Sequence, residues 1–262
     1  MLKLRKYSKV YITGIRSSLI YKTNFFFSLL NVIFCILIQC IFWSALFNNS
    51  NSKNIGGYNY SQIILYSIIS RLLSELIATG FEYKINYDIK SGNLSTFIIK
   101  PIDYLLYQKC FFYGEKTAQI LISFCSLIII KLLFYPCMFN IALIIPIFLA
   151  LILNSVLFSL VSMLGFLFEE VSYVILIIKM IFDIFSGLIF PISMFPKCIS
   201  IVLKFLPFQY TVYSVTNLLI NKFTFLELFK IIFLQISWII FIGIICKYLW
   251  KLGVKRYVSV GG

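Results

Sequence analysis

The sequence predicts an all-α membrane protein with six transmembrane helices. Hydrophobic residues make up 61% of the 262 residues and charged residues only 12%, and the mean hydropathy is +0.98. Soluble domains carry about 25% charged residues. Six spans fit this length if each takes roughly 20 residues plus connections. We therefore expect a single transmembrane domain over residues 1–262.

Residues 1–24 are too basic and too often interrupted to span a membrane. Their apolar positions alternate with lysines and arginines, which predicts an amphipathic helix on the cytoplasmic membrane surface. A basic flank without helical structure is the alternative. Because Lys and Arg are enriched in cytoplasmic segments, we place both this terminus and the basic C-terminal tail in the cytoplasm.

Apolar segments along the rest of the chain predict the spans. They cover about 25–47, 58–80, 114–134, 139–165, 171–190 and 229–250. An Asn-rich loop after the first span and the tight turn "YPCMFN" at 135–140 would then face outside. Glu169 and Glu170 mark a short cytoplasmic crossing.

The longest strongly polar interval lies between the second and third predicted spans. It carries Glu82, Lys84, Asp88, Lys90, Lys100, Asp103 and Lys109. Gly92 can end a helix, and Pro101 can restart the chain after an extended Lys100. A simple positive-inside loop is the alternative, but a plain turn would not need so many residues.

The segment between the fifth and sixth spans contains Pro191, Pro196 and Pro207. Because a helix rarely continues normally through proline, we expect a proline-broken hairpin of short helices. This hairpin would partly re-enter the membrane from the outer face, where protein or water must satisfy the broken backbone. An ordinary external loop lying on the headgroups is the alternative.

Two pairs of opposite charges fall inside apolar spans: Arg71 with Glu75, and Lys179 with Asp183. The i,i+4 spacing puts each pair on one helix face, where the two charges can neutralise each other. A charge near the bilayer centre costs at least about 2.5 kcal/mol, so such residues usually face protein or water. We expect them to line a translocation interface. Self-neutralised pairs, or pairs nearer the membrane surface, are the alternative.

Several kinds of chemistry are disfavoured by the composition. Histidine is absent, and the seven cysteines show no C-x-x-C spacing; this argues against His-based triads and against metal sites. Cys137 and Cys198 could share the external side, and their pairing is left open. The net charge of +14 is explained by topology and anionic lipid, so no nucleic-acid partner is expected.

The only nucleotide-like motif is "GEKT" at Gly114–Thr117. A P-loop needs G-x-x-x-x-G-K-[ST], because its glycines let backbone N–H groups approach the phosphates. Here Glu115 separates the glycine from the lysine, and the upstream glycine is missing. We therefore expect that the chain is not an enzyme and does not hydrolyse ATP by itself.

The order of these features resembles the permease subunits of type-2 ABC transporters, in their bacterial six-span branch. In that branch the second span leads into an isoleucine, a basic residue, Gly and Leu, and then a basic residue with Pro. The matching residues are Ile89, Lys90, Gly92, Leu94, Lys100 and Pro101. The S-G, Pro, F-P and P-F-x-Y order of the family matches Ser186, Gly187, Pro191, Phe195, Pro196, Pro207, Phe208 and Tyr210, and the end "KRYVSVGG" also looks similar.

The resemblance implies that the polar interval is a coupling helix that docks on a separate P-loop ABC ATPase. The implied coupling residues are Glu82, Lys84, Asp88, Lys90, Gly92, Leu94, Lys100 and Pro101. An external gate would use Ser186, Gly187, Pro191, Pro196, Pro207, Phe208 and Tyr210.

The resemblance further implies an exporter in the bacterial cell membrane, built from two copies of this permease or from this chain and a second, related permease. ATP and Mg²⁺ would be bound by the partner ATPase, and this chain would hold no cofactor. A secondary transporter or channel working without an ATPase is the main alternative. A membrane-embedded enzyme is disfavoured by the lack of histidine and the nine acidic residues.

Overall fold

The computed structural model describes residues 2–20, 22–50, 54–134, 141–168, 171–220 and 223–257. Within these residues the fold is helical except for one small antiparallel hairpin, β1 (Asn54–Ile55) with β2 (Tyr58–Asn59). Five segments of the described chain are long and apolar enough to cross a membrane, or six if one bent helix pair is counted. The predicted class, an all-α multi-pass membrane protein, is confirmed.

Some predicted features lie outside the described residues. These are the external turn at 135–140 with Cys137, and therefore its pairing with Cys198, the crossing at Glu169 and Glu170, and the last residues of the C-terminal motif.

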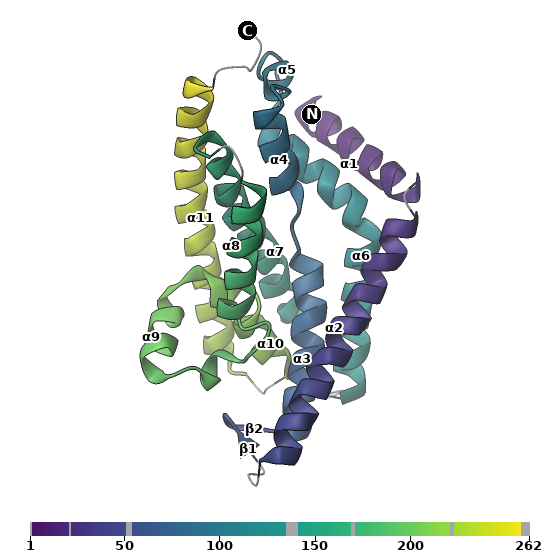
Figure 1. Cartoon of the computed structure of the whole chain (residues 1–262), viewed down its shortest axis with the longest axis vertical. Coiled ribbons are helices and arrows are strands. Elements are labelled where there is room, and N and C mark those ends of the chain that lie inside the picture. Colours follow the sequence, from purple (N-terminus) through teal and green to yellow (C-terminus); the bar gives the residue numbers. More distant parts are fainter. Residues whose placement is uncertain are drawn as a thin grey trace.

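The chain begins with a helix, α1 (Leu2–Ile20), followed by the first span, α2 (Lys22–Asn49). The helix predicted for the basic terminus is confirmed, and it lies across one end of α6 (Tyr104–Phe134) (Figure 1). The two helices cross at Gly14 and Gly114, where a Cβ atom on Gly114 would overlap the carbonyl oxygen of Tyr11. Gly114, the glycine of the "GEKT" motif, therefore lies within α6 and allows α1 to pack closely against it.

The second span is broken. It consists of α3 (Tyr60–Ile77) and α4 (Phe81–Lys90), with residues 78–80 between them. The short α5 (Leu94–Ile98) follows, and α6 begins at Tyr104 rather than at the predicted Gly114. The polar interval is therefore mostly helical and extends the second and third spans beyond their predicted ends.

The next helices are α7 (Ile144–Ser162), flanked by the 3₁₀ turns η2 (Ile141–Leu143) and η3 (Met163–Phe166), and α8 (Ser172–Phe185). With 14 residues, α8 is shorter than the roughly 20 residues that cross a bilayer. The fifth span predicted at 171–190 is thus represented by a short helix.

The proline-rich segment forms η4 (Ile192–Met194), α9 (Lys197–Phe205), η5 (Pro207–Tyr210) and α10 (Tyr213–Ile220). The chain bends by 72° between α9 and the segment Pro207–Ile220. The last span, α11 (Phe225–Arg256), begins with a capping box between Thr224 and Glu227.

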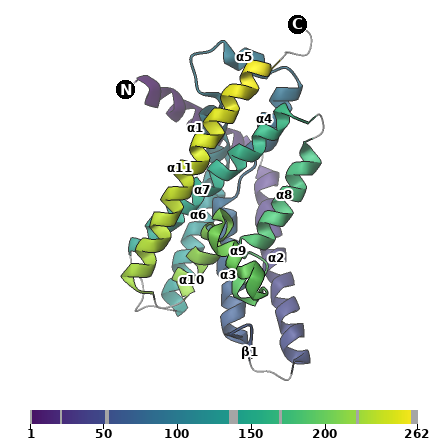
Figure 2. The same cartoon turned by 90° about the vertical axis from the view of Figure 1, so that its left-hand side faces the viewer.

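Figures 1 and 2 show the two ends of the bundle. One end carries α1, α4, α5 and the last turns of α11, whereas β1, β2, α9 and α10 gather toward the other. One buried apolar cluster centres on α3 and α10, and a second joins α4 to α7 and α11. The second cluster packs the polar interval onto the membrane helices.

Candidate functional site

The break in the second span is held by polar side chains from two other helices. The carbonyl oxygen of Ile77 accepts a hydrogen bond from Asn154 Nδ2 on α7 at 2.7 Å. The carbonyl oxygen of Thr79 accepts one from Lys179 Nζ on α8 at 2.9 Å. A broken helix at membrane depth is tolerated only where its freed carbonyls find such partners. The break in the second span is therefore stabilised by specific contacts with α7 and α8.

Lys179 also pairs with the first turn of α4. Its Nζ atom lies 2.5 Å from Glu82 Oε1, and the Glu82 side chain is fully buried. The same ammonium group lies 4.7 Å from the ring centroid of Tyr83. The predicted local pair of Lys179 with Asp183 is wrong, because Lys179 pairs with Glu82 on another helix.

The second predicted local pair is also wrong. Arg71 Nη2 donates to Asn31 Oδ1 on α2 at 3.1 Å. Glu75 lies 3.7 Å from Lys116 Nζ on α6 and accepts a hydrogen bond from Ser28 Oγ at 3.4 Å. These charges therefore connect α3 to α2 and α6.

The four intramembrane charges nevertheless gather at one place. Arg71, Glu75, Lys179 and Asp183 line a cavity of about 170 Å³ between α3, α7 and α8. Asn154 lines the same cavity. Sequence reasoning assigned these four charges to one interface, and the structure brings them together; whether cargo passes there stays a prediction.

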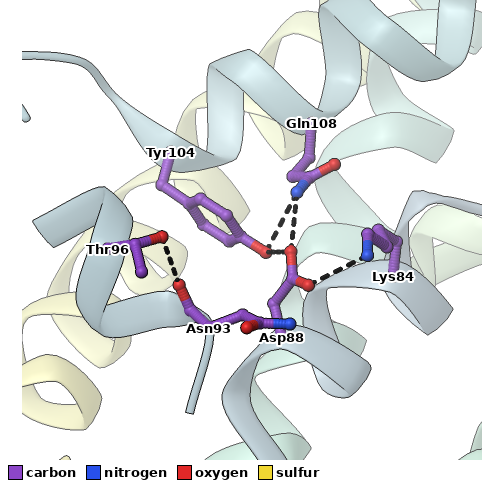
Figure 3. Close-up of polar contacts among 6 residues, drawn as sticks. All are labelled: Lys84, Asp88, Asn93, Thr96, Tyr104 and Gln108. Atoms are coloured by element: carbon purple, nitrogen blue, oxygen red, sulfur yellow. Dashed lines mark hydrogen bonds and ion pairs between the residues drawn. The ribbon is translucent and has the colours of Figure 1, made fainter. Parts of the chain in front are cut away.

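A second polar cluster fixes α4 to α6 (Figure 3). Asp88 Oδ2 accepts hydrogen bonds from the Tyr104 hydroxyl at 2.6 Å and from Gln108 Nε2 at 2.9 Å. Asp88 Oδ1 lies 3.1 Å from Lys84 Nζ. Tyr104, Gln108 and Asp88 are buried. A larger cavity of about 530 Å³ adjoins this cluster between α4, α5 and α6.

The predicted coupling residues divide into two groups. Glu82 and Asp88 are buried and bound to this chain, so the expectation that they contact a soluble partner is corrected. Leu94 is also buried, and Gly92 has φ +78° in the turn before α5. The exposed members are Lys84, Lys90, Lys100 and Pro101.

Three exposed apolar side chains of the same segment were not predicted from the sequence. Ile99 is 84% exposed, and Tyr87 and Ile98 are also exposed. In a chain this apolar, one more isoleucine carries no distinguishing pattern. Only their placement makes them notable: Tyr87 lies in the last turn of α4, Ile98 ends α5, and Ile99 follows it.

At the opposite end, Gly187 forms a fixed turn after α8 with φ +85°. Its carbonyl oxygen accepts a hydrogen bond from the Tyr66 hydroxyl of α3 at 2.5 Å. The carbonyl oxygen of Leu188 accepts bonds from Ser70 Oγ at 3.4 Å and from Gln39 Nε2 at 3.3 Å. The first residues of the predicted gate are therefore held in place by side chains of α2 and α3.

The remaining gate residues shape the bent segment. Pro191 and Pro196 precede η4 and α9, and Pro207 is the first residue of η5. The ring of Phe208 lies 5.7 Å from that of Phe182 on α8. The Tyr210 hydroxyl donates to the carbonyl oxygen of Lys204 at 2.7 Å, at the end of α9. Ser186 accepts a backbone bond from Tyr213 N at 2.9 Å, which ties the turn to α10.

Comparison with known protein families agrees with the resemblance noted in the sequence. Residues 33–261 match the model of a protein family described as "ABC-2 family transporter protein". A search among curated proteins finds no match.

Proposed function

The chain belongs to the ABC-2 family of transporter proteins, since the family match covers most of its length, and we propose that it is the permease of an exporter driven by a separate P-loop ATPase. Residues 1–262 would form one permease domain. ATP and Mg²⁺ would bind to the partner, with no cofactor in this chain. Export is proposed by analogy with the permeases that the sequence resembles.

The proposed orientation puts the end with α1, α4, α5 and the last turns of α11 in the cytoplasm of a bacterial cell, with both termini there (Figure 1). Cations are concentrated in and beside these segments, as is typical of the cytoplasmic side. They include Arg5, Lys6, Lys9, Arg16, Lys90, Lys100, Lys251, Lys255 and Arg256.

The observation that best supports coupling to an ATPase is an exposed surface of apolar and basic side chains at this end. We define the docking surface as the exposed residues Tyr87, Lys90, Ile98, Ile99, Lys100 and Pro101. Exposed apolar side chains rimmed by polar ones mark interaction sites. The surface lies at the far end of α4 from the break in the second span.

The structure also supports a route by which docking could reach the membrane. A Cβ atom on Gly165 would overlap Asn86 Oδ1, so α4 packs directly on η3. One turn earlier, α4 is joined to α8 by the Glu82–Lys179 pair. Because residues 78–80 interrupt the helix, α4 can shift against α3 without bending a continuous helix. Two arrangements of α4 would then move α7 and α8 together.

A second permease, identical or related, would complete the translocation path, with Arg71, Glu75, Lys179 and Asp183 facing it. The turn at Ser186 and Gly187, together with Pro191, Pro196, Pro207, Phe208 and Tyr210, would form the external gate. Its contact with α8 through Phe208 and Phe182 would link the gate to a helix that α4 moves, and its contacts with α2 and α3 would anchor its other end.

Purification from the native membrane tests the proposal. The tagged chain is isolated in mild detergent, and stoichiometric partners are identified by mass spectrometry. The docking variant is Ile99→Ser with Lys100→Glu. The matched control is Leu226→Ser with Lys230→Glu at the start of α11, where Leu226 is 81% exposed.

Recovery of an ABC ATPase with the native chain and the control, but not with the docking variant, is the expected result. An ATPase that stays bound to the docking variant would place the contact elsewhere. If no ATPase accompanies the native chain under conditions that preserve a known ABC complex, a secondary transporter or channel replaces the proposal.

A further inference from the structure

The cavity between α3, α7 and α8, here called the α3–α8 cavity, contains polar groups that the chain itself does not satisfy. Asn154 is only 3% exposed; its Nδ2 atom binds the Ile77 carbonyl, but its Oδ1 atom has no partner in the described structure. Arg71 Nε is likewise buried without a partner there. Leaving such a group unsatisfied costs about 1–3 kcal/mol. Neither atom has accessible surface, so both belong to the polar wall of the cavity, and an occupant would meet the charged groups that line it.

Asp183 adds an available carboxylate. Among the described residues its carboxylate oxygens make no hydrogen bond and no ion pair at contact distance, although the positive charges of Arg71 and Lys179 act on them. The cavity thus presents two kinds of group. The Asp183 carboxylate can accept hydrogen bonds, and the Arg71 guanidinium, whose Nη2 atom donates to Asn31, can donate one.

The charges around the cavity cancel. Arg71 and Lys179 are positive, and Glu75 and Asp183 are negative. The outer partners of this set, Glu82 for Lys179 and Lys116 for Glu75, add one charge of each sign. Because an uncompensated charge is costly away from water, a neutral site favours an occupant whose own charges also cancel.

We propose that the α3–α8 cavity binds a zwitterionic group in which a primary ammonium is joined to a phosphate or carboxylate. The ammonium would donate to the Asp183 carboxylate, and the anionic oxygen would accept from the Arg71 guanidinium. That cargo of this class occupies the cavity during transport rests on the proposed function. Binding itself does not.

The size of the cavity limits what enters. At about 170 Å³ it is smaller than the roughly 300–1,000 Å³ of sites that enclose a whole drug-sized ligand. A headgroup fits, and a longer molecule must leave its remainder outside. Met180 and Ile184 are exposed on α8 beside Asp183, and they offer an apolar surface for such a tail.

The test measures binding to the purified chain in maltoside detergent without any ATPase. Native mass spectrometry gives the apparent Kd for phosphatidylethanolamine, for phosphatidylcholine, whose quaternary amine has no N–H, and for phosphatidylglycerol, which has no amine. Soluble glycerophosphoethanolamine is added as a competitor. The variant Asp183→Asn removes the acceptor charge. Asp103→Asn removes the same charge from an exposed helix start and serves as the control.

Phosphatidylethanolamine is expected to bind about tenfold more tightly than the other two lipids, as the loss of one charged hydrogen bond implies. Asp183→Asn should abolish that preference, and Asp103→Asn should retain it. Competition by glycerophosphoethanolamine would assign recognition to the headgroup alone; its failure to compete would assign the site to a lipid with its tails.

Equal affinity for the three lipids would overturn the proposal and leave the cavity as a water-filled space. This comparison uses the native chain, so it does not depend on the folding of a variant. A preference that survives Asp183→Asn would overturn the assigned site. Since no ATPase is present, neither outcome bears on the partner recovery that tests the proposed function.

Discussion

The carboxylate of Glu82 and the ammonium of Lys179 lie 2.5 Å apart, beside the break in the second span. Lys179 also binds the Thr79 carbonyl inside that break. One side chain of α8 therefore fixes both the first turn of α4 and the unwound residues before it. Any displacement of α4 must carry α8 along or separate this ion pair.

Lys179→Met is expected to lower the free energy of unfolding by about 3–5 kcal/mol, because it leaves the buried Glu82 carboxylate unpaired. The double variant Glu82→Gln with Lys179→Met removes that charge, so most of the loss should be recovered. A remainder of about 1 kcal/mol reflects the Thr79 carbonyl that loses its donor.

Unfolding by titration with dodecyl sulfate, followed by circular dichroism, measures both values. If the single and double variants lose the same stability, the pair does not hold α4 to α8 as described.

Gly114→Ala is expected to separate α1 from α6, because the added Cβ atom overlaps the Tyr11 carbonyl oxygen. Overpacking of this kind costs about 1–3 kcal/mol. Trypsin cleavage at Arg16 in α1 should become faster. The control is Gly243→Ala in α11, where the new Cβ would meet no atom within 4 Å apart from the adjacent residues and backbone of its own helix; alanine should be neutral or stabilising there. Unchanged cleavage in Gly114→Ala would contradict the close crossing.

Hydropathy predicts the spans because the bilayer acts on every residue of a crossing helix. It does not reveal the break between Ile77 and Phe81, since "IATGF" is itself apolar. The groups that stabilise the break, Asn154 and Lys179, lie 77 and 100 residues from the carbonyls they bind. Sequence spacing carries no information about such contacts.

The charges show the same limit. Spacing along one helix predicts that Arg71 pairs with Glu75, yet Asn31 and Lys116 from other helices take these places. The polar character of α4 predicts a partner-facing helix, but packing turns Asp88 inward. Composition could identify which groups matter at the membrane, whereas their partners depend on how the helices assemble.

Gln235→Leu is expected to loosen the junction of α11 with α7 and η5. The fully buried Gln235 Nε2 donates to the carbonyl oxygens of Pro146 at 3.0 Å and Tyr210 at 2.9 Å. Leucine removes both hydrogen bonds, at a cost of about 1–3 kcal/mol. Amide hydrogen exchange over 207–220 should become faster. Ser237→Ala removes a bond from the exposed Ser237 side chain to its own helix α11 and should leave that exchange unchanged. Equal exchange in the two variants would contradict the role of Gln235 at this junction.

Variants of the cluster around Asp88 distinguish how much buried hydrogen bonds and an exposed ion pair each contribute to the free energy of unfolding. Lys84 has a side chain that is 55% exposed, so Lys84→Met should change the unfolding free energy by no more than about 0.5 kcal/mol. Asp88→Ala leaves the buried Tyr104 hydroxyl without its acceptor and removes one of the two bonds from Gln108 Nε2, which keeps its bond to Tyr104, and about 2–3 kcal/mol should be lost.

Asp88→Asn keeps an acceptor oxygen but not the charge, and it should fall between these two variants. Denaturant titration of the three variants gives this order directly. A loss in Lys84→Met as large as that in Asp88→Ala would mean that the exposed ion pair, rather than the hydrogen bonds from α6, holds α4. In that case salt should weaken the attachment of α4, because exposed charges are screened; attachment through Tyr104 and Gln108 predicts little dependence on salt.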